Sequence, residues 1–280
     1  AAYEKLEGAL LQIVKKYHFD NFLMLIKSAG FIAPGMIGSK NDLNFTYALY
    51  LRLREDETMS EGERKRIVRR WFVLSMLTGR HSGSFESTWE QDIRRIGVLG
   101  AANYLKQLEE SELSDAFWTV TLPANLETTS TASPLFQTFL AAQVATGVRG
   151  FLSKSITIAA MHQNSGDIHH IVPKDYLQKN GFPDRGDYNQ VANFALTETS
   201  INISISNKPP DVYMAEVVGQ IETGVLTLGE ITDADDLAKN LQENAIPVGL
   251  ESFTAGRYPE FLDQRRKLMA AVIHKYHQDL

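Results

Sequence analysis

The chain has 280 residues, which is enough for one large domain or two ordinary ones. Its 44% apolar and 22% charged residues are typical of globular proteins, and no apolar run approaches the roughly 20 residues that span a bilayer. The absence of cysteine excludes disulfides and thiolate metal sites. The net charge of −6 argues against a large nonspecific DNA-binding surface but leaves a local one open.

Apolar residues at helical spacing predict that the first part of the chain is helical. The expected helices cover residues 1–30, 42–54, 60–78, 87–95 and 101–110. The third is the most clearly marked, because Ser60 and Glu63 form a capping-box signature at its start. The Gly- and Ser-rich segment that follows contains Arg80 and His81, and we expect it to be a plain connecting loop.

Residues 111–134 lack clear periodicity and are rich in Thr, Ser and Pro. We therefore place a domain boundary in this segment, with a helical domain over 1–115 and a second domain over 116–280. The elements expected after it are a helix over 135–145, a strand over 155–161 and a final helix over 258–277. The basic run Arg265-Arg266-Lys267 in that last helix is expected to be a solvated helix face.

The most informative feature is the run Gly166-Asp167-Ile168-His169-His170-Ile171-Val172-Pro173, which contains two of the seven histidines. Its β-forming residues predict a strand over 167–172, which Pro173 ends. Neighbouring side chains of a strand point to opposite faces, so His169 and His170 are expected to do different jobs. A phosphodiester hydrolase needs two such jobs, because one group deprotonates the attacking water and another holds a divalent cation.

A second apolar run, over 191–197, is expected to pair with this strand as a hairpin. Its one polar intruder is Asn193. An amide at that position can bridge backbone groups and fix the loop that carries the general base.

A helix is expected after this second strand. Thr197 or Thr199 is its expected N-cap, and Asn202 falls in its first turns. Strand, strand and helix would then bring His169 and Asn202 together around one cation. The predicted fold class is α+β, mostly helical, with this ββα-metal element embedded in a helical domain and a nuclease core at about 166–210.

The histidine run, together with Asn193 nine residues before Asn202, resembles the HNH motif of His-Me finger nucleases. It is similar to the HNH domain of CRISPR effector nucleases, in which an acidic residue precedes the base. The longer string from Asp167 to Lys208 resembles the C-terminal nuclease domain of GmrSD-type restriction endonucleases.

Two upstream segments also look like the helical region that precedes that domain in the GmrSD-type family. They are Arg69-Arg70-Trp71-Phe72 and Gly79-Arg80-His81-Ser82-Gly83. The resemblance covers most of the chain and is specific between residues 166 and 210. It implies that an N-terminal nucleotide-handling domain belongs with this chain, although the motif of that domain is not found in the sequence.

The resemblance also implies a role for each motif residue. His170 would be the general base and His169 a metal ligand. Asn202 would be the second ligand and Asn193 the structural asparagine. The residues that would support these groups or contact a phosphate are Asp167, Lys174, Ser206, Asn207 and Lys208. Among them, Asp167 is expected either to orient His169 or to bond to the backbone as a strand-end residue.

Mg²⁺ is the expected cofactor, because it favours oxygen ligands and keeps several waters, while an imidazole ligand also accepts Mn²⁺, Ni²⁺ or Zn²⁺. The predicted function is a metal-dependent DNA endonuclease that nicks or cuts foreign or modified DNA in an anti-phage restriction system. The expected location is the cytoplasm of a prokaryotic cell, without a membrane partner. Two alternatives stay open: a non-catalytic helical module that binds DNA or protein and has a structural ββα element, and an RNase that uses the same site.

Overall fold

The computed structural model describes residues 2–163 and 166–280. Within them the chain is mostly helical and contains one two-stranded antiparallel sheet, so the predicted α+β class with a helical majority is confirmed. None of the described helices is long and apolar enough to cross a bilayer. Residue 1 of the first expected helix lies outside the described residues.

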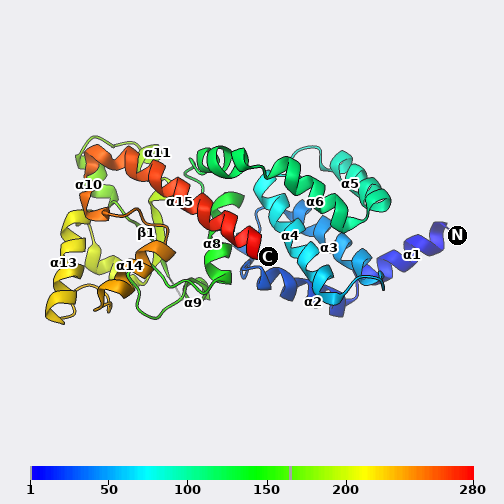
Figure 1. Cartoon of the computed structure of the whole chain (residues 1–280), viewed down its shortest axis with the longest axis horizontal. Coiled ribbons are helices and arrows are strands. Elements are labelled where there is room, and N and C mark those ends of the chain that lie inside the picture. The colour runs from blue at the N-terminus through cyan, green and yellow to red at the C-terminus, as the bar shows by residue number, and fades with distance from the viewer. Residues whose placement is uncertain (1, 164–165) are drawn as a thin grey trace.

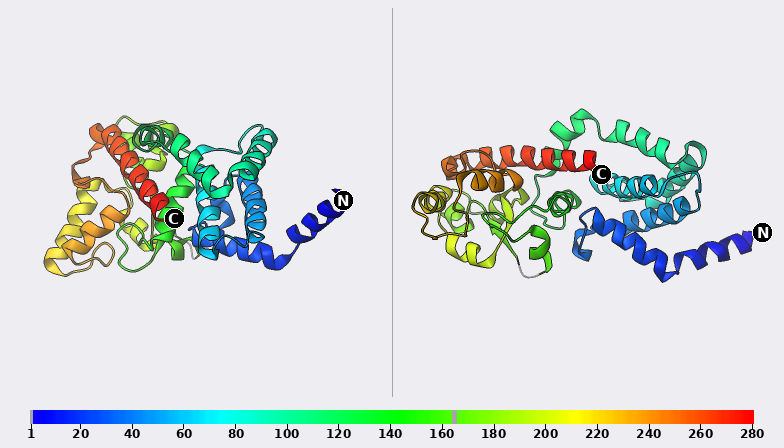
Figure 2. Two further views of the ribbon diagram at one scale, coloured as in Figure 1. Left: turned by 45° about the vertical axis from the view of Figure 1, so that its right-hand side comes forward. Right: turned by 60° about the horizontal axis from the view of Figure 1, so that its bottom comes forward.

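The first part of the chain forms six helices at one end of the molecule (Figure 1). They are α1 (Ala2–Ile13), α2 (Lys16–Ser28), α3 (Lys40–Arg54), α4 (Glu61–Thr78), α5 (Phe85–Leu99) and α6 (Ala101–Glu112). Helix α1 projects away from the other five (Figure 2). The predicted cap of α4 is present, because the Ser60 hydroxyl accepts a hydrogen bond of 3.2 Å from the Glu63 backbone N–H.

The second part surrounds the sheet with short helices. They are α7 (Leu122–Asn125), α8 (Pro134–Ala145), α9 (Ile158–Gln163), α10 (Lys174–Lys179), α11 (Arg185–Tyr188), α12 (Thr199–Ile205), α13 (Pro210–Thr223), α14 (Ala234–Glu243) and α15 (Tyr258–Asp279). The strands are β1 (Asp167–His170) and β2 (Phe194–Thr197). The last helix, α15, runs from the sheet end of the molecule to the neighbourhood of α4 (Figure 1).

A continuous hydrophobic core joins the two parts. Helix α4 contacts α8, and the end of α2 packs directly on α8 at Gly30. Gly30 has a φ of +93°, and a Cβ there would lie 2.0 Å from the Ala141 carbonyl oxygen, so only glycine permits this approach. Near the C-terminal end of α15, the Tyr276 hydroxyl donates to the Ala29 carbonyl at 2.5 Å. The division at residues 115/116 into two domains stays a prediction.

The sequence predicted one continuous helix over residues 1–30, but the structure has two separate helices, α1 and α2, in this segment. Lys15 has an extended backbone, with φ −67° and ψ 109°, which ends α1 before α2 begins. The apolar side chains that predicted one buried face do not all reach the core. Leu6 and Leu10 are 59% and 51% exposed. The helical spacing of these residues therefore predicted helical structure correctly, but Leu6 and Leu10 of α1 lack the burial that usually accompanies such spacing.

The expected strand over 155–161 is also wrong. Helix α9 begins at Ile158, and Thr157 forms only an isolated antiparallel bridge with Arg149. The Thr157 hydroxyl accepts a hydrogen bond of 3.3 Å from the Ala160 backbone N–H, which is how a helix N-cap behaves. The β-branched residues that suggested a strand therefore start a helix instead.

The aperiodic segment 111–134 contains helical structure that its sequence pattern did not reveal. A π-helical turn at Phe117–Thr121 leads into α7, and Phe117, Trp118 and Leu122 are buried. A π-helix does not repeat at 3.6 residues, so a search for the α-helical period misses it. Both elements contact α15.

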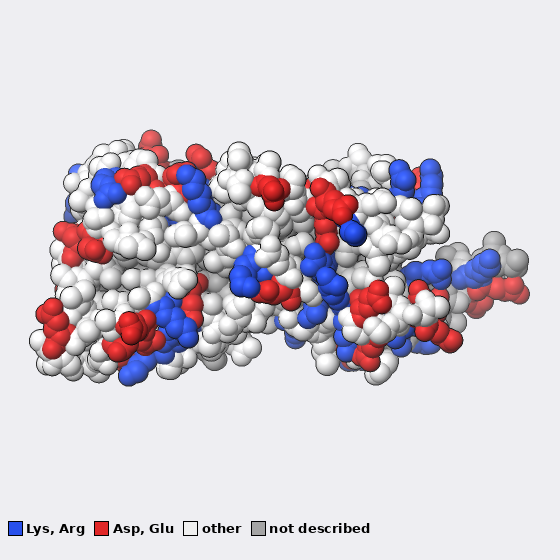
Figure 3. All heavy atoms as spheres, in the orientation of Figure 1, with Lys and Arg blue, Asp and Glu red and all other residues white. Residues whose placement is uncertain are grey.

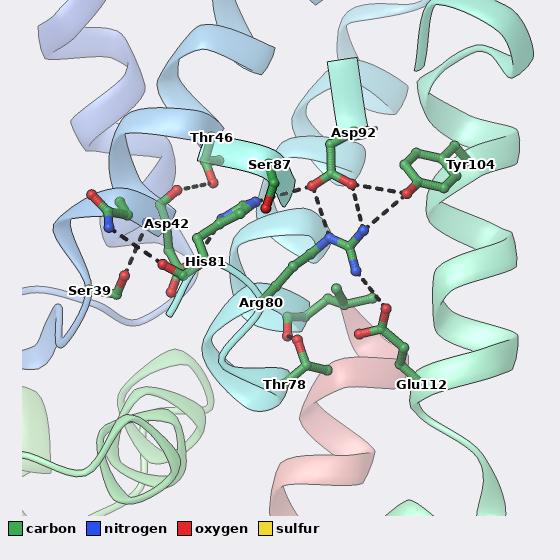
Figure 4. Close-up of polar contacts among 12 residues, drawn as sticks. Ser39, Asp42, Thr46, Thr78, Arg80, His81, Ser87, Asp92, Tyr104 and Glu112 are labelled. Carbon is green, nitrogen blue, oxygen red and sulfur yellow. Dashed lines mark hydrogen bonds and ion pairs between the residues drawn. The ribbon is translucent and has the colours of Figure 1, made fainter. Parts of the chain in front are cut away.

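The predicted plain loop after α4 instead places Arg80 and His81 in a buried ionic network (Figure 4). His81 is fully buried, with Nδ1 2.8 Å from Asp42 Oδ1 and Nε2 3.1 Å from Asp92 Oδ2. Arg80 donates to both oxygens of Asp92 at 2.9 and 2.5 Å and to Glu112 at 2.6 Å. The network joins α3, α5 and α6 to the end of α4.

Burial alone would lower the pKa of His81, but the hydrogen bonds and charges of Asp42 and Asp92 outweigh it and raise that pKa above the ordinary 6.5. The same network lowers the pKa of Asp92, because His81 and Arg80 stabilise its carboxylate against the cost of burial. The two carboxylates therefore favour the charged form of His81 in the folded protein.

The raised pKa of His81 predicts a pH-dependent contribution to stability. It is fully present below about pH 6.5, where the unfolded chain also binds the proton, and is lost as pH rises through the folded-state pKa. Each unit of pKa elevation corresponds to about 1.4 kcal/mol. The stability advantage of the wild type over His81→Gln, measured by urea unfolding, should shrink between pH 6 and pH 9.

The control for this measurement is His274→Gln. The pKa of His274 is lowered by burial and by His277, so its contribution has the opposite sign. A difference between wild type and His81→Gln that does not change with pH would show that the pKa of His81 is the same in the folded and the unfolded chain.

Candidate active site

The histidine run lies on the two-stranded sheet, with α12 beside it. β1 and β2 pair antiparallel, with His169 opposite Ala195 and His170 opposite Phe194. Each strand has only four residues, so both are shorter than predicted, and Val191–Asn193 forms a 3₁₀ turn before β2. Pairing continues one step beyond β1, because the Ile171 N–H donates to the Asn193 carbonyl at 2.9 Å.

The two histidines have different side-chain partners. His169 Nδ1 donates to Asn202 Oδ1 on α12 at 2.8 Å. His170 Nε2 is 2.8 Å from the side-chain oxygen of Asn189, which directly follows α11. The structure thus brings His169 and Asn202 together, as the sequence predicted, and gives His170 a partner that the sequence did not predict.

His169 is almost completely enclosed, with 3% of its surface exposed. Its ring stacks on Phe151, with centroids 6.0 Å apart and an angle of 13° between the ring planes. Burial lowers the pKa of His169 to about 4, so the imidazole is neutral near pH 7. Its Nε2 is buried without a hydrogen-bond partner among the described residues. Orphaned buried nitrogens of this kind are uncommon and often mark a bound ion, a water or a functional role.

Asp167 orients Asn202 rather than His169, which corrects the prediction for this carboxylate. The Asn202 amide nitrogen donates to Asp167 Oδ2 at 3.2 Å. This bond turns the amide oxygen of Asn202 towards His169. A supporting carboxylate is therefore present, but it acts on the other member of the pair.

His170 is partly enclosed and lies against the edge of β2. The Phe194 ring meets its imidazole edge-on, with centroids 5.0 Å apart. Burial lowers the pKa of His170, the hydrogen bond that His170 donates to Asn189 opposes that effect, and the nearby Lys174 lowers the pKa further. His170 is therefore neutral at neutral pH, which is the state in which an imidazole accepts a proton.

Asn193 makes the backbone contacts that the sequence predicted. Its side-chain oxygen accepts from the Val172 N–H at 2.9 Å, and its nitrogen donates to the Val172 carbonyl at 3.0 Å and to the Tyr188 carbonyl at 3.1 Å. Val172 lies two residues after His170, and Tyr188 directly precedes Asn189. The buried amide therefore ties the loop after β1 to the end of α11.

Arg265 was expected to be solvated but is only 1% exposed. It donates to the carbonyls of Ala192 and Phe194 at 2.8 and 2.7 Å, on both sides of Asn193. Burial lowers its pKa to about 9, which still leaves it charged at neutral pH. Sequence reasoning missed this contact because the two partners are 73 and 71 residues away in the chain.

The predicted cap of α12 is replaced by another arrangement. Glu198 occupies the N-cap position and accepts a hydrogen bond from Ser153 through its side chain. Thr197 instead donates to the Phe151 carbonyl at 2.7 Å, and the Phe151 N–H donates to Leu196 at 2.8 Å. Phe151, which stacks on His169, is therefore held against the free edge of β2.

The other candidates lie around this core. Ser206 ends α12 with a φ of 52°, and both Ser206 and Asn207 are exposed. Lys208 forms an ion pair with Glu216 at 2.7 Å. The Lys174 ammonium lies 5.5 Å from the centre of the Tyr188 ring, on the His170 side of the sheet. The positive charge of Lys174 acts on a motif histidine, because it lowers the pKa of His170.

The His169–Asn202 pair fits a divalent cation in separation and in chemistry. Two neighbouring ligands in an octahedral Mg²⁺ shell, each about 2.1 Å from the ion, are about 3 Å apart. The observed separation of His169 Nδ1 from Asn202 Oδ1 is 2.8 Å. A cation would take the place of the Nδ1 proton, which would move to the unpartnered Nε2, and the Nδ1 lone pair and the amide oxygen would then both be suitable donors. The described residues hold no cluster of three or more His, Asp or Glu side chains that could bind a metal, so solvent and substrate oxygens would supply the remaining ligands.

Comparison with known proteins gives no match to a family model, to a curated protein or to a solved structure.

The three hydrogen bonds of Asn193 predict a large loss of stability on its replacement. Asn193→Leu keeps a similar size but leaves the backbone groups of Val172 and Tyr188 buried without partners, which should cost about 3 kcal/mol. Chemical unfolding measures this loss. Asn180→Leu is the control, because the Asn180 amide makes one exposed bond to its own helix. Equal effects of the two substitutions would contradict the role of Asn193 as a brace.

Proposed function

We propose that the chain is a metal-dependent nuclease that hydrolyses phosphodiester bonds in DNA. In this proposal β1, β2 and α12 form the ββα-metal element of an HNH, or His-Me finger, nuclease. The observation that carries it is the division of the two histidines, with His169 paired to Asn202 across β1 and α12 and His170 held separately by Asn189. Two adjacent rings with separate partners can serve as a metal ligand and as a general base.

His170 would act as the general base. Its neutral ring accepts the proton of the attacking water, and the conjugate acid then returns that proton to solvent. Asn193 would keep the base in place, because it fixes the backbone two residues after His170. Lys174, beside His170, would attract the phosphate backbone towards the base.

His169 and Asn202 would hold the cation. A divalent ion there would supply Lewis-acid stabilisation of the charge that develops on the phosphate and on the leaving oxygen. Asp167 would keep the Asn202 oxygen turned towards the ion, and the low pKa of His169 would keep its lone pair free down to about pH 4. Mg²⁺ or Mn²⁺ would be used under physiological conditions.

The charge pattern favours DNA binding at a local site over binding across a wide nonspecific surface. Lys and Arg alternate with Asp and Glu on the face in Figure 3, and the net charge is −6. Sequence or modification specificity would then come from elsewhere in a restriction system, such as a nucleotide-handling half of the GmrSD type. We propose foreign or modified DNA in a prokaryotic cytoplasm as the setting.

The proposal predicts metal-dependent nicking of supercoiled plasmid. Wild-type chain should nick in Mg²⁺ or Mn²⁺ and stop on addition of EDTA. His170→Ala should reduce the rate about 10²- to 10⁴-fold, because a general base contributes an effect of that size. His274→Ala, a histidine of α15 outside the site, should nick like wild type.

The same assay separates the alternatives. Cleavage of single-stranded RNA with no cleavage of DNA would make the protein an RNase. Calorimetric titration of Mn²⁺ into His170→Ala should show binding of the metal. The substitutions His169→Ala and Asn202→Ala should each weaken that binding. A chain that cleaves neither nucleic acid in either metal, and binds no Mn²⁺, would contradict the proposed function.

A further inference from the structure

The contact between His170 and Asn189 fixes how the imidazole is protonated. The amide oxygen of Asn189 lies 2.8 Å from His170 Nε2, and an amide oxygen can only accept a hydrogen bond. Nε2 must therefore carry the proton in the neutral ring. The lone pair is then on Nδ1, and Nδ1 makes no hydrogen bond with the described residues.

The backbone around Asn189 is held from two sides. Asn189 ends α11, and its N–H donates to the Arg185 carbonyl at 3.1 Å. The carbonyl of the preceding Tyr188 accepts from Asn193 at 3.1 Å. The buried Tyr258 of α15 donates to the Asp187 carbonyl at 3.1 Å. The amide of Asn189 is thus presented to His170 by a backbone with little freedom to move.

The ring of His170 has little room to turn away from this partner. Phe194 meets the imidazole at an angle of 88°, and Tyr188 lies 6.2 Å away between ring centroids. A flip of the ring by 180° would place Cε1 where Nε2 lies and break the hydrogen bond to Asn189. The aromatic neighbours and the amide together select one orientation and one tautomer.

We propose that Asn189 is a positioning residue that holds His170 as the Nε2–H tautomer and so makes Nδ1 the atom that accepts the proton from water. This inference rests on the proposed function for the role of Nδ1, but the tautomer itself does not depend on any activity. The side chain of Asn189 is hydrogen-bonded to His170, while the proposed metal ligands His169 and Asn202 are bonded to each other. Its effect should therefore appear at the base and not in the binding of the cation.

The test is ¹⁵N NMR of the full chain with labelled histidine, without metal or DNA. The His170 signals are identified by their loss in His170→Gln. Wild type should show an Nε2–H proton that exchanges slowly enough to be detected, because it is hydrogen-bonded and partly enclosed. Asn189→Ala should lose that proton signal, and Asn189→Asp should keep it, because a carboxylate also accepts.

Nicking rates of the same variants give the second readout. Asn189→Ala should lower the maximal rate about 10-fold or more with little change in the DNA concentration that gives half that rate, and Asn189→Asp should recover part of the rate. Asn180→Ala is the matched control, because Asn180 also ends a short helix but contacts no histidine. It should change neither readout.

The two readouts separate the failures. A His170 proton that sits on Nδ1, or that is unchanged in Asn189→Ala, overturns the inference whatever the nicking rates are. A proton that behaves as expected while nicking is equally fast in wild type, Asn189→Ala and His170→Ala supports the tautomer assignment and overturns the proposed function. Loss of both signal and rate in Asn189→Ala, with recovery in Asn189→Asp, supports both.

Discussion

One buried amide, the side chain of Asn193, joins the segments on which the candidate site depends. Its oxygen and nitrogen bond to the backbone just after His170 and just before Asn189. Arg265 holds the carbonyls on either side of Asn193 from α15. An unpaired amide or guanidinium in this environment would be costly, so each member of the set requires the others. The position of the candidate base is therefore fixed by polar groups that belong to the core.

The same chain buries histidines in two opposite ways. His81 lies between two carboxylates, which raise its pKa, while His169 faces an amide and an aromatic ring, so burial lowers its pKa to about 4. The charged form suits a network that holds helices together. The neutral form leaves one ring nitrogen of His169 with a free lone pair. The partner, and not burial alone, decides which form the fold selects.

The parts of the fold that sequence predicted well are those with local signals. The capped helix after Ser60 and the polar Asn193 in an apolar run each depend on residues within a few positions. The features that were missed depend on distant partners or unusual periods. Arg265 seemed solvated because its carbonyl partners, in the 3₁₀ turn before β2 and at the start of β2, are far away in the chain. Thr157 seemed part of a strand because a β-branched residue is common in strands, and its capping bond to Ala160 is visible only in the folded structure. His169 and Asn202 were predicted as a pair from spacing alone, but Asn189 was not assigned to His170, because that contact depends on the path of the chain through α10 and α11.

The very short sheet makes pairing register unusually important here. Side chains alternate along a strand, so a slip of β1 by one residue would turn both His169 and His170 to the opposite face of the sheet. His170 would then face α12, and His169 would leave its enclosed position beside Phe151. Hydrogen bonds between two four-residue strands offer weak protection against such a slip. Asn193 bonds to both the N–H and the carbonyl of Val172, just beyond the end of β1. These bonds fix the pairing register of β1, and so they determine which of the two adjacent histidines faces α12.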